Sequence, residues 1–136
     1  YSDRIKLLFH SLKGNFKEDT INLVVSHLFA TGAENTGSER NIELGGSFIV
    51  DKECFPKEAQ YIALGHIHKP MILPGTNKKI RYAGSPLQYN KKEISFEKKC
   101  FIVDILSVFP NLLGRVNNFT PALSFRISSI NLLLST

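Results

Sequence analysis

The sequence predicts an α/β fold, because one amphipathic helical pattern and two short β-branched runs stand in its first half. The helical pattern opens the chain, with apolar residues at the i, i+3, i+4 and i+7 positions: Ile5, Leu8, Phe9 and Leu12. Gly14 follows in the place of a C-terminal cap. INLVVS (21–26) and YIALG (61–65) have the length and aliphatic composition of buried strands, so a sheet with a covering helix is expected.

Weaker patterns surround these two strands. Residues 31–46 are rich in Gly, Glu, Asn, Thr and Ser and predict a long polar loop. SFIVDKECF (47–55) suits a short strand and a helical turn equally well. PGTN (74–77) is a strong turn signal, so KIRYAG (79–84) is predicted to return as a strand after a hairpin-like stretch. CFIVDI (100–105) is predicted to form the next strand.

The chain divides by composition near residue 104. Residues 105–136 contain no acid and only two bases, Arg115 and Arg126, and Ser, Asn, Leu and Phe dominate. This atypical hydrophobic tail either forms short buried elements on the sheet or does not belong to the natural domain, for example through a shifted reading frame. The opening residue is Tyr within a helical pattern, so residues 1–104 are expected to be part of a longer domain.

The net charge of +5 is local. Residues 69–99 hold eight bases and two acids, a surplus of +6, so the rest of the chain carries −1. Such a patch attracts a phosphodiester polymer, with Lys69, Lys78, Lys79 and Arg81 as candidate phosphate contacts. The alternative is that these side chains line solvated hairpin edges, where lysine also discourages strand pairing.

Three sequence features bear on the compartment. Cys54 and Cys100 form no CxxC pair, which favours reduced, buried thiols. No secretory leader opens the sequence, and no apolar run approaches the length of a membrane span. A cytoplasmic protein with no membrane association is therefore predicted.

Three of the four histidines stand at or just past the end of an apolar strand: His27, His66 and His68. That edge of an α/β sheet is where ligands bind. In extended backbone, side chains two residues apart share a face, so His66 and His68 are predicted to converge, and a parallel neighbouring strand would bring His27 beside them. Gly65 lets the backbone turn there. The three histidines leave two interpretations open: a metal site, of one zinc or of two metals, or an ordinary surface on which they meet by coincidence.

These blocks resemble one family. YIALGHIHKP, KIRYAGSPLQY and VVSHLFATGAENTGSER are similar in order and spacing to the second half of a calcineurin-like metallophosphoesterase domain, in its SbcD-type DNA nuclease branch. The likeness covers about residues 1–104. It implies a partial α/β sandwich of mixed sheets flanked by helices. GHxH alone is common among phosphoesterases, whereas its combination with RYAGSP and Ser-Glu-Arg is more specific.

The resemblance implies a two-metal Mn²⁺ centre that hydrolyses DNA phosphodiesters as an exonuclease and endonuclease in DNA end processing and repair. His27 and His66 would bind one ion and His68 the other. The Gly-Ser-Pro turn would support the site, so its structural residues with the glycine of GHxH are Gly65, Gly84, Ser85 and Pro86. An SbcC-type ATPase subunit is the implied partner.

The sequence also departs from that family. No Asp-x-His, Gly-Asp or Gly-Asn-His motif occurs, so the bridging carboxylate and the catalytic histidine of the family are absent and no catalytic residue is assigned. The chain alone is therefore predicted to be inactive. The alternatives are part of another calcineurin-like phosphoesterase, or a non-catalytic half domain. An incomplete sandwich would also leave an apolar sheet face open.

Overall fold

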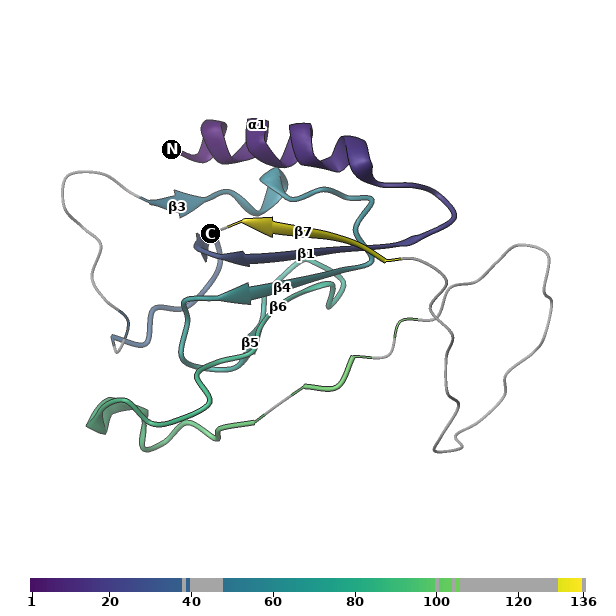
Figure 1. The fold of residues 1–136 in the computed structure, drawn as a ribbon. Coiled ribbons are helices and arrows are strands. Elements are labelled where there is room, and N and C mark those ends of the chain that lie inside the picture. Colours follow the sequence, from purple (N-terminus) through teal and green to yellow (C-terminus); the bar gives the residue numbers. More distant parts are fainter. Residues whose placement is uncertain (38, 40–47, 100, 104, 106–129, 136) are drawn as a thin grey trace, which may run out of the picture.

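The computed structural model describes residues 1–37, 39, 48–99, 101–103, 105 and 130–135, the last range by its backbone alone (Figure 1). Its main layer is a five-stranded sheet in the order β5-β6-β4-β1-β7. The strands are Met71–Ile72 (β5), Ile80–Tyr82 (β6), Tyr61–Gly65 (β4), Ile21–His27 (β1) and Ile130–Ser135 (β7). A second sheet pairs Phe29–Ala30 (β2) with Ile49–Val50 (β3). The predicted α/β class is confirmed, as a mixed sheet with one helix among the described residues.

The strand register determines where the site lies. β4 is parallel to β1, which puts Gly65 opposite His27, and β6 is parallel to β4. β5 runs antiparallel to β6, as expected for a hairpin around residues 74–77. In Figure 1 the arrowheads of β1, β4 and β7 point the same way. The carboxyl ends of the predicted strands therefore meet at one edge, which is the edge that the histidines follow.

The two faces of the sheet differ in cover. The α1 helix (Ser2–Leu12) packs on one face, where Phe9 and Val24 are 1% and 0% exposed. Burying such a side chain stabilises the fold by about 1.5–3 kcal/mol. On the other face Val25 is 37% exposed and Arg81 is partly exposed. The expectation of a sheet face with incomplete cover agrees with these exposures.

The end of α1 differs from the prediction. Leu8 is 42% exposed although the pattern placed it inward. The C-cap is Lys13, with an ordinary right-handed φ of −64°, and the chain continues as a 3₁₀ turn over Lys13–Asn15 (η1). Because the backbone never enters the left-handed region, Gly14 does not act as a C-terminal cap.

Two further segments can be compared with their predictions. SFIVDKECF was predicted to form a strand or a helical turn, and it forms both, since β3 is followed by a 3₁₀ turn over Lys52–Cys54 (η2). The predicted strand over CFIVDI is wrong for its described residues, because 101–103 and 105 join no strand. Phe101 instead lies under the Arg81 guanidinium, with 4.5 Å from Cζ to the ring centroid, and Ile102 is 92% exposed.

Of the tail at residues 105–136, the structure describes residue 105 and the strand β7. β7 pairs in parallel with β1, from Ile21 opposite Ile130 to Ser26 opposite Ser135, so its backbone extends the sheet. Residues 106–129 and 136, which make up most of the tail, and Cys100 lie outside the described residues. The division at residue 104 stays a prediction. Cys54 is a buried free thiol, and no helix among the described residues is long and apolar enough to cross a membrane.

Candidate metal centre

His27 lies directly over Gly65 at the carboxyl edge of the sheet. The two residues are partners in the parallel β1–β4 ladder. A Cβ at Gly65 would lie 2.7 Å from Nδ1 of His27, a distance that real Cβ atoms do not reach. Gly65 is therefore needed because the imidazole occupies the space that a side chain would take.

His66 turns toward the same point by an unusual backbone conformation. Its φ is +99°, a region that L-residues rarely adopt and that costs about 1–3 kcal/mol. The turn sets its ring at 5.4 Å from the His27 ring, centroid to centroid, and at 84° to it. Phe29 flanks His66 at 6.1 Å. Burial lowers the pKa of His66, and His27 lowers it further, which favours the neutral imidazole that metals bind.

His68 is held by different contacts. Its Nδ1 lies 2.8 Å from Oε1 of Glu93, and its backbone N–H donates to Oε1 of Glu39 at 3.0 Å. The strand ends at Gly65, so the two imidazoles of GHIH do not stand side by side on an extended strand. The predicted alternation is wrong in that detail: the left-handed His66 breaks it, and the buried Ile67 anchors the segment between the rings.

Glu93, in the 3₁₀ turn Lys91–Glu93 (η3), is the centre of a buried polar cluster. Its side chain is 0% exposed. The Lys98 ammonium donates to Oε2 at 2.6 Å and lowers the pKa of Glu93 to about 2, with His68 and Ser85 adding to the effect. An acid outside the strands thus connects the GHxH segment with the Gly-Ser-Pro turn.

The Gly-Ser-Pro turn packs against the backbone that carries His68. Gly84 has a φ of +82°, and a Cβ there would lie 2.8 Å from Pro70 and 3.0 Å from the carbonyl oxygen of His68. The Ser85 N–H donates to that same oxygen at 3.1 Å. Pro86 is exposed. The GHIHKP and AGSP segments therefore pack directly against each other beside the candidate site.

Tyr82 fixes the segment that follows His27. Its side chain is 0% exposed, its hydroxyl donates to the Leu28 carbonyl at 3.0 Å, and it accepts from the Ala30 N–H at 2.8 Å. Burial raises the pKa of Tyr82 to about 12. A residue of β6 thus holds the chain where it leaves β1.

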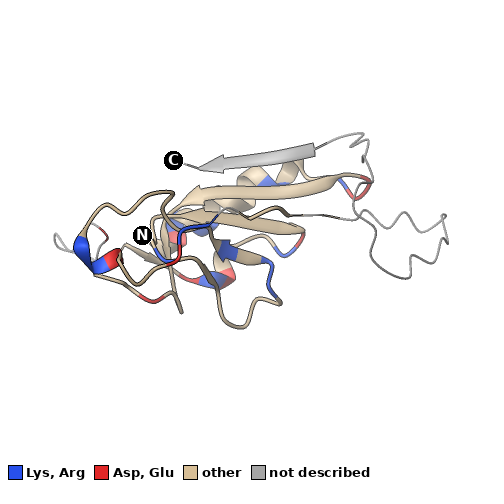
Figure 2. Cartoon of the chain, turned by 90° about the horizontal axis from the view of Figure 1, so that it is seen from below, with Lys and Arg blue, Asp and Glu red and all other residues tan. Residues whose placement is uncertain are grey.

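The structure does not gather the predicted basic residues at the histidines. Lys69 lies there and pairs with Glu34 at 3.2 Å. Lys78 and Lys79 precede β6 at the opposite edge, more than about 10 Å away along the strands. Arg81 lies within β6 on the open face, where its buried Nε has no hydrogen-bond partner. Figure 2 shows Lys and Arg spread over separate segments.

Sequence reasoning missed two acids. Glu39 belongs to the Ser-Glu-Arg block, whose Ser38 and Arg40 lie outside the described residues. Burial alone would raise the pKa of Glu39, but hydrogen bonds from the Thr36 hydroxyl and the His68 N–H lower it overall. No sequence pattern indicated that Glu93 belongs to the site, because it lies in a lysine-rich segment without hydrophobic periodicity. The position of Glu39 in a quoted motif was the only available clue.

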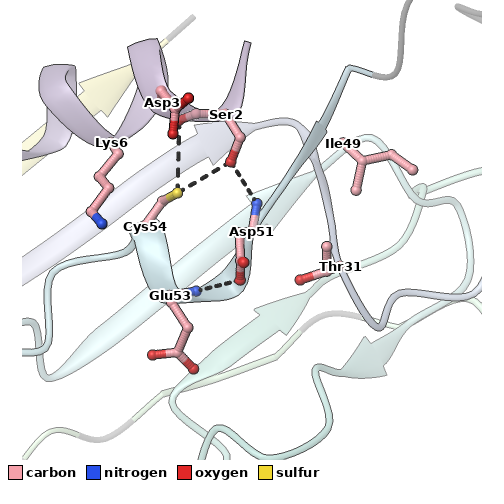
Figure 3. A pocket seen from close by; sticks show the side chains of 8 residues that line it. All are labelled: Ser2, Asp3, Lys6, Thr31, Ile49, Asp51, Glu53 and Cys54. Carbon is pink, nitrogen blue, oxygen red and sulfur yellow. Dashed lines mark hydrogen bonds between the residues drawn. The ribbon is translucent and has the colours of Figure 1, made fainter.

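A separate polar hollow lies beside the start of α1 (Figure 3). Ser2 contacts the Cys54 thiol at 3.3 Å and accepts from the Asp51 N–H at 3.0 Å, and Asp51 caps η2 through the Glu53 N–H. These polar groups stabilise local structure, and no histidine lines the hollow.

The candidate metal ligands fit an ion in part. Two imidazoles, His27 and His66, face one another closely enough to share a small volume. Within the described residues, however, no group of three or more His, Cys, Asp or Glu side chains could hold a metal ion. Among the described residues the geometry therefore brings two imidazoles together with a third nearby, and it groups no carboxylate with that pair, although a divalent centre prefers carboxylates.

A mixed α/β sheet with these histidines at its carboxyl edge is consistent with a partial calcineurin-like metallophosphoesterase domain. No model of a protein family matches the sequence. Among curated proteins it is similar to the SbcD subunits of SbcCD nucleases. The match to the Bacillus subtilis protein is 38% identical over 76% of this chain and 27% of the relative. That from Rhodobacter capsulatus is 34% identical over 61% of this chain and 20% of the relative.

The SbcD protein from Staphylococcus epidermidis is 29% identical over 77% of this chain and 27% of the relative. These matches confirm the resemblance: the chain is related to the SbcD-type nuclease subunits. It spans about a quarter of the length of these relatives or less, with coverage of 20–27%.

Proposed function

We propose that this chain supplies the histidine side of a two-metal phosphodiesterase centre in an SbcD-type DNA nuclease. The observation that carries the proposal is the packing of His27 onto Gly65, opposite the His66 ring at 5.4 Å. A side chain at residue 65 would abolish it. The kinship with the SbcD proteins indicates the class of reaction.

In this proposal His27 and His66 bind one ion, and His68 binds the other. A pair of divalent ions would polarise the phosphodiester and activate the attacking water. The residues themselves orient the nitrogens: Gly65 leaves room for His27, and the left-handed backbone aims His66 at it. Tyr82 holds the chain just beyond His27.

The proposed ion is Mn²⁺, and its remaining ligands are proposed to be carboxylates from outside the described residues. Two imidazoles bring no negative charge, whereas two dications close together need bridging carboxylates. The isolated chain is therefore expected to bind Mn²⁺ weakly and to cleave no DNA. An isolated half domain without catalysis is the second candidate, and the absence of a three-ligand cluster among the described residues favours it for this chain alone.

DNA is the proposed substrate of the whole protein, in end processing and repair, and an SbcC-type ATPase is its proposed partner. The relatives are named as parts of an SbcCD nuclease, which supports both proposals. Lys69 is the basic residue best placed for a phosphate contact, since it follows His68 directly and is 43% exposed on its side chain. Lys78 and Lys79 would reach DNA only at the opposite edge of the sheet.

The test is an NMR titration of this chain with Mn²⁺, read as paramagnetic broadening of the histidine ring signals. The His27 and His66 rings should broaden together and first, and His27→Ala should abolish the effect on His66. His10, exposed on α1, is the internal control. Uniform broadening of all four histidines would contradict the shared ligand pair, and Mn²⁺-dependent cleavage of duplex DNA by the purified chain would contradict its inactivity.

A further inference from the structure

A buried carboxylate stands directly behind His68, on the far side of its ring from Nε2. Glu93 is 0% exposed, and hydrogen-bonding groups contact both of its oxygens. Burying a carboxylate is costly unless charges and hydrogen bonds compensate, so a fully enclosed Glu has a structural or functional reason. Here Lys98 neutralises it at 2.6 Å, while His68 is only 27% exposed on its side chain.

The donors are divided unevenly between the two oxygens of Glu93. Oε2 accepts from the Lys98 ammonium at 2.6 Å, the Ser85 hydroxyl at 3.2 Å and the Tyr89 N–H at 3.3 Å. Oε1 faces Nδ1 of His68 at 2.8 Å and the Asn90 amide at 3.5 Å. Because an ionised carboxylate can only accept, the short contact requires the hydrogen to be on Nδ1.

We infer that Glu93 is a positioning residue that holds His68 as the Nδ1–H tautomer, so that its lone pair lies on Nε2 as a metal ligand. This inference rests on the proposed function in one respect, that His68 binds an ion. A carboxylate that accepts from one ring nitrogen sets the tautomer and orientation of the other and raises its basicity. Lys98 and Ser85 in turn keep Glu93 ionised and oriented.

The same geometry makes Glu93→Gln a sharp test. The NH₂ group of a glutamine cannot occupy the Oε2 position, because the Lys98 ammonium and the Tyr89 N–H already donate to the atom there. The glutamine carbonyl oxygen must take that place, which turns the NH₂ toward Nδ1 of His68. Two donors cannot face each other, so Nδ1 becomes the acceptor and the hydrogen moves to Nε2. The substitution should therefore invert the tautomer without removing the cluster.

The experiment is a long-range ¹H–¹⁵N correlation of the histidine rings of the full chain at about pH 8.5, above the ordinary imidazole pKa of about 6.5. In the unaltered chain the ¹⁵N shift of His68 Nε2 should lie in the unprotonated range, and in Glu93→Gln in the protonated range. Glu97→Gln is the matched control, because Glu97 is exposed and pairs with Lys99. Its His68 signals should not change.

Two outcomes would overturn the inference: a protonated Nε2 in the unaltered chain, or an unchanged tautomer in a folded Glu93→Gln variant. Circular dichroism establishes folding, and if Glu93→Gln unfolds, Ser85→Ala should weaken the Nδ1–H preference more mildly.

Mn²⁺ broadening of the His68 ring signals separates the role of Glu93 in setting the tautomer from the role of His68 as a metal ligand. A loss of about 10- to 100-fold in apparent Mn²⁺ affinity at His68 is expected for Glu93→Gln. A correct tautomer switch without any Mn²⁺ effect at His68 would overturn its role as a ligand and leave the role of Glu93 as orienting group intact.

Discussion

His66 and His68 stand one residue apart in sequence, yet the structure holds them by different physical means. His66 is placed by backbone geometry: a left-handed φ of +99° and the bare Cα of Gly65 under the neighbouring His27 ring. His68 is placed by side-chain hydrogen bonds, through a buried acid that lies 25 residues further along the chain. A two-histidine motif therefore needs two separate supports, and each can be broken without the other.

The largest expected effect is that of Gly84→Ala, which attacks the support of His68. The added methyl would meet Pro70 at 2.8 Å and the His68 carbonyl oxygen at 3.0 Å, at a φ of +82°. Left-handed strain and overpacking together should cost about 2–4 kcal/mol in the free energy of unfolding, measured by urea denaturation. The His68 ring signals should shift, and those of His27 should not. A stability equal to that of the unaltered chain would contradict the close packing of the two blocks.

Gly65→Ala attacks the other support. Its methyl would lie 2.7 Å from Nδ1 of His27, so the ring must move away from His66. We expect a loss of about 1–3 kcal/mol in urea denaturation. The perturbation of ring signals should be confined to His27 and His66, the reverse of the Gly84→Ala pattern.

Gly14→Ala is the matched control, because nothing lies within 4 Å of a Cβ there and its φ is not positive. It should leave stability unchanged or raise it by about 0.4–1 kcal/mol. If Gly65→Ala and Gly14→Ala proved equally stable, the proposed contact between His27 and Gly65 would be wrong.

The contact of Tyr82 with the segment after His27 can be tested by the loss of stability at alkaline pH. Its pKa is about 12 in the folded chain, against an ordinary 10.0. A raised acid pKa means that the folded state keeps the proton longer, so the stabilisation is complete below pH 10.0 and is lost as the pH rises from there through about 12. Unfolding free energies measured across that window should fall.

Tyr82→Phe should remove this contribution to the alkaline decline and should cost about 1–3 kcal/mol at neutral pH, because the Ala30 N–H loses its buried acceptor. Tyr89→Phe, at a residue that is 62% exposed, should preserve the full decline. An alkaline profile that Tyr82→Phe leaves unchanged would contradict the assignment.

The local patterns predicted the strands of the site well. Tyr61–Gly65 matched its prediction residue for residue, and β1 ended at His27 as expected. Short aliphatic runs with a glycine stop carry a local signal, since burial and chain termination act within the run itself. The strand over CFIVDI was predicted by the same composition and was wrong, because a run needs a neighbouring strand to pair with and the described part of this one has none.

The candidate site was predictable only where it depends on strand order. Parallel pairing of two strand ends was enough to bring His27 near His66. The contact between His68 and Glu93 was not predictable, because it joins a strand-end loop to a 3₁₀ turn with no shared periodicity. For the same reason Lys78 and Lys79, close to the site in sequence terms, lie at the opposite edge of the sheet.

The fold class, the strand ends and the kinship with SbcD-type subunits follow from the amino-acid sequence, because they depend on local composition and motif order. The group that each histidine nitrogen faces is set by the three-dimensional packing. This arrangement depends on the bare Cα of Gly65, the left-handed His66 and the ionised Glu93, and each of these acts through groups brought together by packing. Ligand orientation is a property of distances in space, which sequence spacing does not specify.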